Sequence, residues 1–120
     1  MRRLVAVTGG RTYSNWTVVH RELFSLIDGI ENVHDWPHIL VGDAQGADKL
    51  VRETCKSLGI AYDVFYADWH KWGKAAGPKR NQEIIDCEPQ LLIAFPGGRG
   101  TADMISRAEH DKIEIRKILE

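Results

Sequence analysis

The 120-residue sequence has few of the features that mark disulfide-rich, metal-binding or membrane proteins. It contains two cysteines, Cys55 and Cys87, and neither belongs to a CxxC pair or lies near histidines at metal-ligand spacing. We expect both to be reduced thiols. Long apolar runs are also missing, because the run that follows Arg2 and Arg3 has only four residues, too few for a signal peptide or a membrane span. These absences predict a cytoplasmic protein without a membrane partner.

An excess of charge of either sign is missing too. The chain has 16 lysines and arginines against 17 aspartates and glutamates, which gives a net charge of -1. This balance leaves no general basic surface for nonspecific nucleic-acid binding. The apolar fraction of 43% and the charged fraction of 28% are those of an ordinary globular protein. With no linker, repeat or low-complexity segment, residues 1–120 are expected to form a single domain.

Short apolar runs alternate with amphipathic stretches in the order β-α-β-α-β-α-β-α-β. Continuous apolar runs at 4–7, 39–41 and 91–95 predict central strands that are covered by helices on both faces. Residues 61–66 and 113–119 alternate more with polar residues and predict strands nearer the edges. Right-handed crossovers between neighbouring strands then favour a mostly parallel five-stranded sheet in the order 3-2-1-4-5. The predicted fold is a single Rossmann-like α/β domain of three layers.

Apolar residues recur at helical spacing over 16–30 and 50–58 and predict two helices that pack on the sheet. A third helix is expected to begin at Pro78, where the missing N–H of proline is tolerated, and to end before Pro89. A fourth is expected to begin near Thr101, a suitable N-cap residue, and to turn its apolar face inward.

Glycine-rich loops follow strands one, two and four, at residues 8–13, 42–48 and 96–101. Strands one and four are neighbours in the predicted order, and the chain leaves them in opposite directions, which opens a crevice at their carboxyl ends. Glycine lets backbone N–H groups approach a ligand, and a helix N-terminus attracts phosphate. The alternative is that the glycines only turn each strand into the next helix. No loop matches GxGxxG or GxxxxGK[ST], so neither an ordinary Rossmann dehydrogenase nor a P-loop NTPase is indicated.

Four motifs resemble a known family: GGRTY at 9–13, GDAQGAD at 42–48, WxxxGxxAGxxRN at 69–81 and PGGRGT at 96–101. In this order they are similar to the YspA branch, related to YpsA, of the SLOG superfamily. That superfamily includes the Lonely Guy-type phosphoribohydrolases and the DNA-processing protein DprA. The resemblance implies a Rossmann-like domain that binds nucleotides or nucleotide-derived ligands, and it suggests a homo-oligomer.

The resemblance breaks down at the main catalytic residue of the phosphoribohydrolases. Their loop reads PGGxGTxxE, and the position of that glutamate is Met104 in this chain. A thioether can neither accept a proton nor stabilise an oxocarbenium-like centre. Asp103, one position earlier, would point about 100° away around a helix of roughly 3.6 residues per turn. The remaining candidates for a catalytic role are Arg80, Asp103 and Asp48.

Arg80 is the first candidate for phosphate binding, with Asn81 beside it in the expected first turn of the third helix. It stands in the position that resembles the phosphoribohydrolase arginine, and a guanidinium can hold phosphate by two parallel hydrogen bonds. The alternative is a solvated arginine on an exposed helix face. The predicted ligand-binding residues are Gly9, Gly10, Arg11, Tyr13, Gly42, Gly46, Asp48, Trp69, Gly77, Arg80, Asn81, Pro96, Gly97, Gly98, Gly100 and Thr101.

Several of these side chains have two interpretations. Arg11 could reach the crevice, and Tyr13 could stack on a base or cover the start of a helix. Asp48 could accept ribose hydroxyls or charge the first turn of its helix. Trp69 is expected in a loop that passes over the crevice, where it could form a base-stacking wall or lid, or it could pack in the core or against a partner.

The leading functional hypothesis is the binding or sensing of a nucleotide, an ADP-ribose-like molecule or a cyclic-nucleotide signal. The second is an N-glycosidic hydrolase for a nucleoside monophosphate, in which Asp48, Asp103 or a bound water replaces the missing glutamate. The third is single-stranded nucleic-acid binding in a local basic groove with Trp69 and Trp72 as platforms. No cofactor and no metal site are predicted, because the HxxxH spacing at 34–38 straddles a proline turn.

Overall fold

Five parallel strands form one sheet in the computed structural model, which describes residues 2–120. The strands are β1 Leu4–Thr8, β2 His38–Gly42, β3 Tyr62–Phe65, β4 Leu91–Ala94 and β5 Glu114–Lys117. Their order is β3-β2-β1-β4-β5, which confirms the predicted order and the two predicted edge strands. In the register, Ala6 of β1 stands between Leu40 of β2 and Leu92 of β4.

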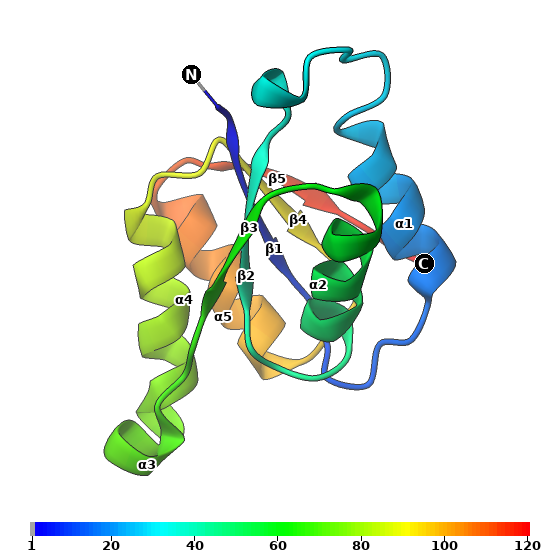
Figure 1. The fold of residues 1–120 in the computed structure, drawn as a ribbon. Coiled ribbons are helices and arrows are strands. Elements are labelled where there is room, and N and C mark those ends of the chain that lie inside the picture. Colours follow the sequence, from blue (N-terminus) through cyan, green and yellow to red (C-terminus); the bar gives the residue numbers. More distant parts are fainter. Residues whose placement is uncertain (1) are drawn as a thin grey trace.

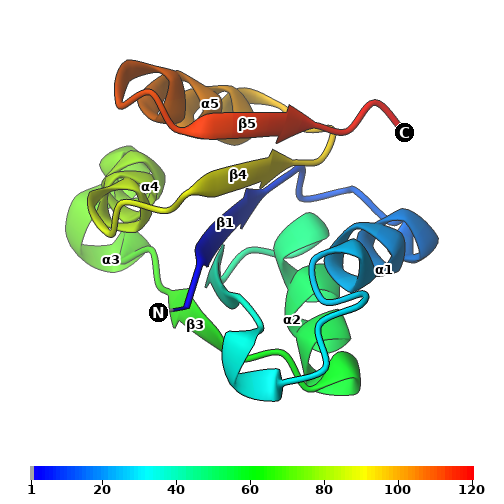
Figure 2. The same ribbon diagram turned by 90° about the horizontal axis from the view of Figure 1, so that it is seen from above.

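Helices cover both faces of this sheet. They are α1 Trp16–Ser25, α2 Ala47–Leu58, α3 Trp69–Trp72, α4 Ala76–Asp86 and α5 Arg99–His110, with short 3-10 turns at Val33–Asp35 and Gly73–Ala75. Helices α1 and α2 lie on one face, and α4 and α5 lie on the other (Figures 1 and 2). This is the predicted three-layer α/β arrangement. None of the helices in residues 2–120 combines the length and the apolar character that a bilayer crossing needs.

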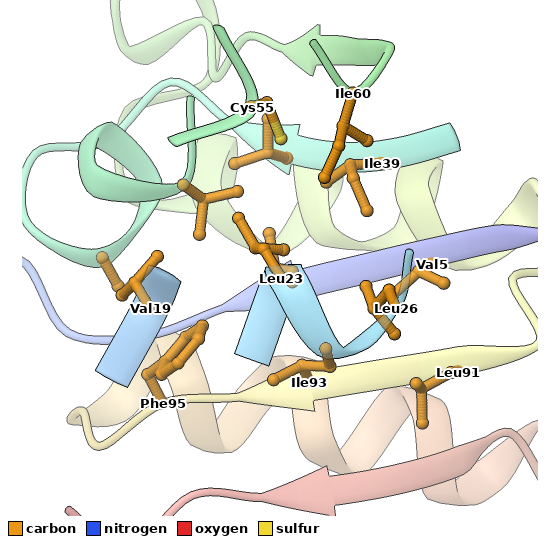
Figure 3. Close-up of a cluster of buried hydrophobic side chains, with 14 of the residues drawn as sticks. Val5, Val19, Leu23, Leu26, Ile39, Cys55, Ile60, Leu91, Ile93 and Phe95 are labelled. Atoms are coloured by element: carbon orange, nitrogen blue, oxygen red, sulfur yellow. The ribbon is translucent and has the colours of Figure 1, made fainter. Parts of the chain in front are cut away.

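The sheet separates two apolar layers because successive side chains of a strand point to opposite faces. Val5 and Val7 pack toward α1 and α2, whereas Ala6 between them packs toward α4 and α5. In the first layer Leu23 of α1 and Cys55 of α2 are fully buried above the sheet (Figure 3). Burial raises the pKa of the Cys55 thiol to about 12, so this thiol is protonated at neutral pH and packs as an apolar group.

Helix α4 begins two residues earlier than predicted. It starts at Ala76 rather than at Pro78, and the proline occupies the third helical position. An N–H at that position has no intrahelical acceptor in any case, so proline costs the helix nothing there. Arg80 and Asn81 consequently lie in the second turn of α4 and not in the first.

The ends of two other helices also differ from the prediction. Helix α5 begins at Arg99 with Gly98 as its N-cap, so Thr101 is its third residue and not its cap. Helix α1 ends at Ser25, although the apolar spacing continues beyond it, because Ile27 is buried by the turn that follows rather than by the helix.

Candidate ligand-binding site

A cleft of about 1190 Å³ lies at the carboxyl ends of β1 and β4. The chain leaves β1 toward α1 and β4 toward α5, on opposite faces of the sheet (Figure 2). Open α/β sheets bind ligands at such a switch point. The loop after β1 is hydrogen-bonded to both neighbouring loops, since Gly10 N–H donates to Pro96 C=O at 2.9 Å and Gly10 C=O accepts from Ala47 N–H at 3.0 Å. The three glycine-rich loops are therefore in contact at one edge of the sheet.

Two glycines permit this close packing. Gly46 has a φ of +72°, and a side chain there would collide with the main chain of Gly10 and Arg11. A Cβ atom at Gly97 would collide with the Thr101 side chain and would lie 2.6 Å from the Gly10 nitrogen. These two glycines keep the second and fourth loops against the first.

The N-terminus of α5 opens into the cleft with unpaired donors. Its N-cap is Gly98, which has no side chain to cap the helix. The first bond of the helix runs from Ala102 N–H to Gly98 C=O at 3.0 Å, so the amides of the residues between them lack an intrahelical acceptor. Residues 97–100 are exposed, and Cβ positions at Gly98 and Gly100 would face open space. The helix therefore presents accessible N–H groups and the positive end of its dipole to the cleft.

Thr101 adds a buried hydroxyl to the same wall of the cleft. The residue is 6% exposed, and its Oγ1 atom lies beside Gly97 without a hydrogen-bond partner anywhere in residues 2–120. An unsatisfied buried hydroxyl costs about 1–3 kcal/mol. Such groups are rare in native proteins.

The predicted site residues of the first loop are partly engaged within the protein. The Gly10 amide is bonded to Pro96, as described above, and is not free for a ligand. The Tyr13 hydroxyl donates to the Glu120 carbonyl at 3.0 Å, and its ring packs on Phe95 with ring centres 5.5 Å apart. Burial and the Glu120 carboxylate raise the pKa of Tyr13. Tyr13 thus covers the segment before α1 at one end of the cleft.

Arg80 reaches the cleft from α4, but its guanidinium is already paired. Nη1 donates to Asp43 Oδ1 at 2.9 Å, and Nε donates to Asn81 Oδ1 at 3.2 Å. The side chains of Arg80 and Asp43 are only 12% and 26% exposed, so the ion pair is shielded from water. The pairing offsets much of the positive charge on which the phosphate prediction depends. Nη2 makes no hydrogen bond within residues 2–120 and is the part of Arg80 that is left for a ligand.

Asp48 lies below the second loop rather than on the open surface of the cleft. The residue is 5% exposed, and its Oδ2 accepts from Ala44 N–H at 3.2 Å. Burial raises the pKa of Asp48, while the charge of Arg80 acts in the opposite direction. One turn further along α2, Arg52 donates to the Gly42 carbonyl at 2.8 Å. Asp48 therefore lies in the first turn of α2 and holds the second loop through the Ala44 amide.

Asp103 and Met104 face different surroundings on α5. Met104 is 1% exposed in the apolar layer between α5 and the sheet. Asp103 lines the cleft, where its Oδ2 accepts from Asn81 Nδ2 at 3.0 Å and from Arg107 Nε at 2.9 Å. Burial acts to raise the pKa of Asp103, but these two hydrogen bonds outweigh it and lower the pKa, so the group is a carboxylate at neutral pH. Asn81 also donates to the Gly100 carbonyl at 3.3 Å and so joins α4 to the α5 loop.

Trp69 lines the cleft from α3. It begins α3, a short helix in a segment that was predicted to be a loop. The Trp69 ring lies against Gly77 of α4, since a Cβ there would be 3.3 Å from the ring. The Arg11 guanidinium lies over the ring at 5.1 Å from its centre. Trp69 therefore forms an exposed aromatic wall and is not a core residue.

A second pocket of about 180 Å³ adjoins the cleft. It contains Asp43 and Gln45, which sequence analysis did not single out, and it shares Arg11, Trp69 and Arg80 with the cleft. Asp43 could have been identified from its position directly after β2, where acidic residues of nucleotide-binding folds often lie. In residues 2–120 no three His, Cys, Asp or Glu side chains gather as they would around a metal ion.

Most of the predicted ligand-binding residues are brought together by the fold. Only Gly42 and Gly46 among them do not line the cleft, since they shape the loop beneath it. The cleft also contains residues that were not predicted, which are Thr12, Ser14, Asn15, Ala44, Lys74, Pro78 and Arg99.

Two solved structures of low sequence identity share this fold. DprA from Streptococcus pneumoniae matches with a TM-score of 0.72 and 18% identity, over 99% of this chain and 51% of that chain. The Chlamydomonas rheinhardtii Moco carrier protein matches with a TM-score of 0.67 and 20% identity, over 98% of this chain and 76% of that chain. This chain thus spans about half the length of DprA. These likenesses and the strand order show a Rossmann-like α/β fold that the chain shares with both proteins.

A curated relative defines the family more narrowly. The gene 61 protein of Mycobacterium phage D29 is 30% identical over an alignment of 125 positions, gaps included, which covers 96% of this chain and 94% of that protein. The chain belongs to the family of this gene 61 protein. No family model matches the chain.

Proposed function

We propose that this protein binds a phosphorylated nucleotide-type ligand in the cleft, as a member of the YspA branch of the SLOG superfamily. The ligand classes that fit are a nucleotide, an ADP-ribose-like molecule and a cyclic-nucleotide signal. The observation that carries the proposal is the uncapped N-terminus of α5, which presents its first amides beside the buried and unpaired Thr101 hydroxyl. A phosphate group placed there gains several N–H donors and the field of the helix dipole.

Outside the proposed phosphate site, the cleft has room and suitable side chains for the sugar and base of a nucleotide. Its volume of about 1190 Å³ is ample for a mononucleotide, since sites for drug-sized ligands span about 300–1,000 Å³. Trp69 offers an exposed aromatic ring in the lining of the cleft, and a base gains about 1–3 kcal/mol by stacking on such a ring. Arg80 also lines the cleft, and its Nη2 atom, which makes no hydrogen bond in residues 2–120, can donate to the ligand.

Binding without turnover is better supported than hydrolysis. The position that corresponds to the phosphoribohydrolase glutamate is Met104, which is buried in the apolar layer behind the cleft. Asp103 does line the cleft, but Asn81 and Arg107 hold it as a carboxylate with a lowered pKa. A carboxylate in that state is a poor general acid for a leaving base.

The proposal is tested by mass spectrometry of small molecules released from the purified protein, followed by calorimetric titration with the four ribonucleoside monophosphates, ADP-ribose and cyclic AMP. Recovery of an intact nucleotide, or saturable binding of one of these probes, is the expected result. A protein that releases no nucleotide and binds none of the probes would overturn it. Incubation of any nucleotide that binds, with chromatography for the free base, separates binding from hydrolysis, since steady base release would show an enzyme instead.

A second candidate function, single-stranded nucleic-acid binding, is favoured by one cluster next to the cleft. Trp72 of α3 is 44% exposed, and the ammonium groups of Lys71 and Lys79 lie 4.8 Å and 4.2 Å from its ring centre. Cations beside an aromatic platform are typical of surfaces that track a polynucleotide. Titration of a fluorescent oligonucleotide at rising salt tests this function, because phosphate contacts give a steep loss of affinity. Affinity that is absent at low salt would exclude it.

A further inference from the structure

The small pocket beside the cleft is lined by Asp43 together with Arg11 and Arg80. Its volume of about 180 Å³ is below the range of whole-ligand sites, so it can hold only one part of a larger molecule. Asp43 enters it from the end of β2, and the exposed Gln45 lies two residues further along the same loop. Because it shares Arg11, Trp69 and Arg80 with the cleft, one ligand can occupy both spaces.

Two hydrogen bonds to Oδ1 hold Asp43 in a fixed orientation and leave its other oxygen without a donor in residues 2–120. Its Oδ1 accepts from Ala67 N–H at 3.3 Å and from Arg80 Nη1 at 2.9 Å. Its Oδ2 accepts no hydrogen bond from any group in residues 2–120. A carboxylate only accepts hydrogen bonds, so this oxygen favours a ligand that brings hydroxyl groups and repels one that brings a second anion.

The position of Asp43 agrees with this chemistry. It directly follows the second strand of a Rossmann-like sheet, and an acidic residue in the corresponding region of dinucleotide-binding folds accepts from a ribose hydroxyl. Asp48 was the sequence-based candidate for that role, but it is 5% exposed and bonded to the Ala44 amide. The partly exposed carboxylate of Asp43 at the end of β2 is therefore the better candidate.

We infer that Asp43 binds the ribose hydroxyls of the ligand, and that the protein selects ribonucleotides over their 2′-deoxy counterparts. This inference rests on the proposed function, and it adds the class of sugar and the direction of the ligand. The phosphate lies at the α5 N-terminus, the base lies along Trp69, and the sugar edge points to the β2 end of the sheet. Arg80 contributes by holding the carboxylate through Nη1.

The test compares a ribonucleoside monophosphate with its 2′-deoxy form in calorimetric titrations of the wild type and the Asp43→Asn variant. The probe is whichever of AMP, GMP, CMP and UMP binds most tightly. A charge-assisted hydrogen bond corresponds to a preference of about tenfold for the ribose form. We expect that preference in the wild type and a preference of about twofold or less in Asp43→Asn. Asp28→Asn makes the same change at an exposed position outside both pockets and is expected to retain the wild-type preference.

The ratio of the two affinities separates recognition from structure. If Asp43 only supports the loop, its substitution lowers both affinities by the same factor and leaves the ratio unchanged, which would overturn the inference. An absent preference in the wild type would overturn it as well. Tighter binding of either nucleotide to Asp43→Asn would show that the pocket takes a phosphate instead. If no nucleotide binds to the wild type, the proposed function itself fails, and the sugar assignment fails with it.

Discussion

The guanidinium of Arg11 lies over the ring of Trp69, 5.1 Å from the ring centre, and so connects the loop after β1 to α3 across the cleft. Both side chains are exposed, and a contact of this kind contributes about 0.5–1 kcal/mol at an exposed site. A nucleotide base that stacks on the same ring gains about 1–3 kcal/mol. A ligand can therefore displace Arg11 from Trp69, which leaves the guanidinium free to approach a phosphate.

Replacement of Trp69 by alanine is expected to weaken nucleotide binding by about tenfold, because one base-stacking contact is lost. Trp72→Ala is the matched control, since Trp72 has similar exposure and lies in the same short helix but does not line the cleft. Isothermal titration with the ligand that the proposed function identifies is the measurement. Equal losses in the two variants would mean that α3 acts as a whole and that Trp69 is not the wall of the base site.

The uncapped start of α5 gives a second prediction. Gly98→Asp and Gly98→Asn place a carboxylate and an amide of the same shape at the N-cap, where a Cβ meets open space. Either residue is a good cap, so the free energy of unfolding should change by only about 0.5 kcal/mol. Affinity for a phosphorylated ligand should fall more than about tenfold for Gly98→Asp, through repulsion and competition for the amides, and less for Gly98→Asn. Equal affinities for the two variants and the wild type would place the phosphate elsewhere.

The loops after β1 and β4 are in contact. We therefore expect alanine substitutions at Gly97 and Gly100 to have different effects on the free energy of unfolding. A methyl group at Gly97 would meet the Gly10 nitrogen at 2.6 Å as well as the Thr101 side chain, so Gly97→Ala should lower the free energy of unfolding by about 1–3 kcal/mol. Gly100→Ala adds the same methyl group inside α5, facing open space, and should leave stability unchanged or raise it by up to about 1 kcal/mol. Urea unfolding followed by circular dichroism measures both. A similar loss at both positions would contradict the close contact of the loops.

Local patterns in the sequence were sufficient for the architecture but not for the helix starts. The apolar run at 91–94 and the alternation at 114–117 separate a central strand from an edge strand, because burial on two faces and on one face leaves different patterns. The N-termini of α4 and α5 were misplaced because Pro78 and Thr101 have strong preferences for helix starts. The backbone begins each helix earlier, and in α5 the cap is a glycine.

The strand order predicts which loops form the site, but it does not predict which of their side chains pair. Neighbouring β1 and β4 bring the loops at 8–13 and 96–101 together, and the sequence order alone predicts this. The pairing of Arg80 with Asp43 spans 37 positions, from the loop after β2 to helix α4, and no periodicity encodes such a contact. Sequence spacing also does not show which carboxylate of a loop is accessible to a ligand. Asp48, and not Asp43, was therefore the sugar-binding candidate.

The Asp103 carboxylate predicts a dependence of stability on pH. Its pKa in the folded protein is lowered, mainly through Arg107 and Asn81 against the effect of burial, so it contributes stability above its ordinary pKa of 3.8 and loses it as the pH falls through the folded value. With a side chain 29% exposed, solvent screening limits this contribution to about 1 kcal/mol. Asp103→Asn should therefore be less stable than the wild type by about 1 kcal/mol at pH 7, and the difference should shrink as urea unfolding is repeated below the ordinary pKa. Asp28→Asn, at an exposed position with no ion pair in residues 2–120, should show no such trend. A deficit in Asp103→Asn that persists at low pH would mean that shape and not charge accounts for the role of this side chain.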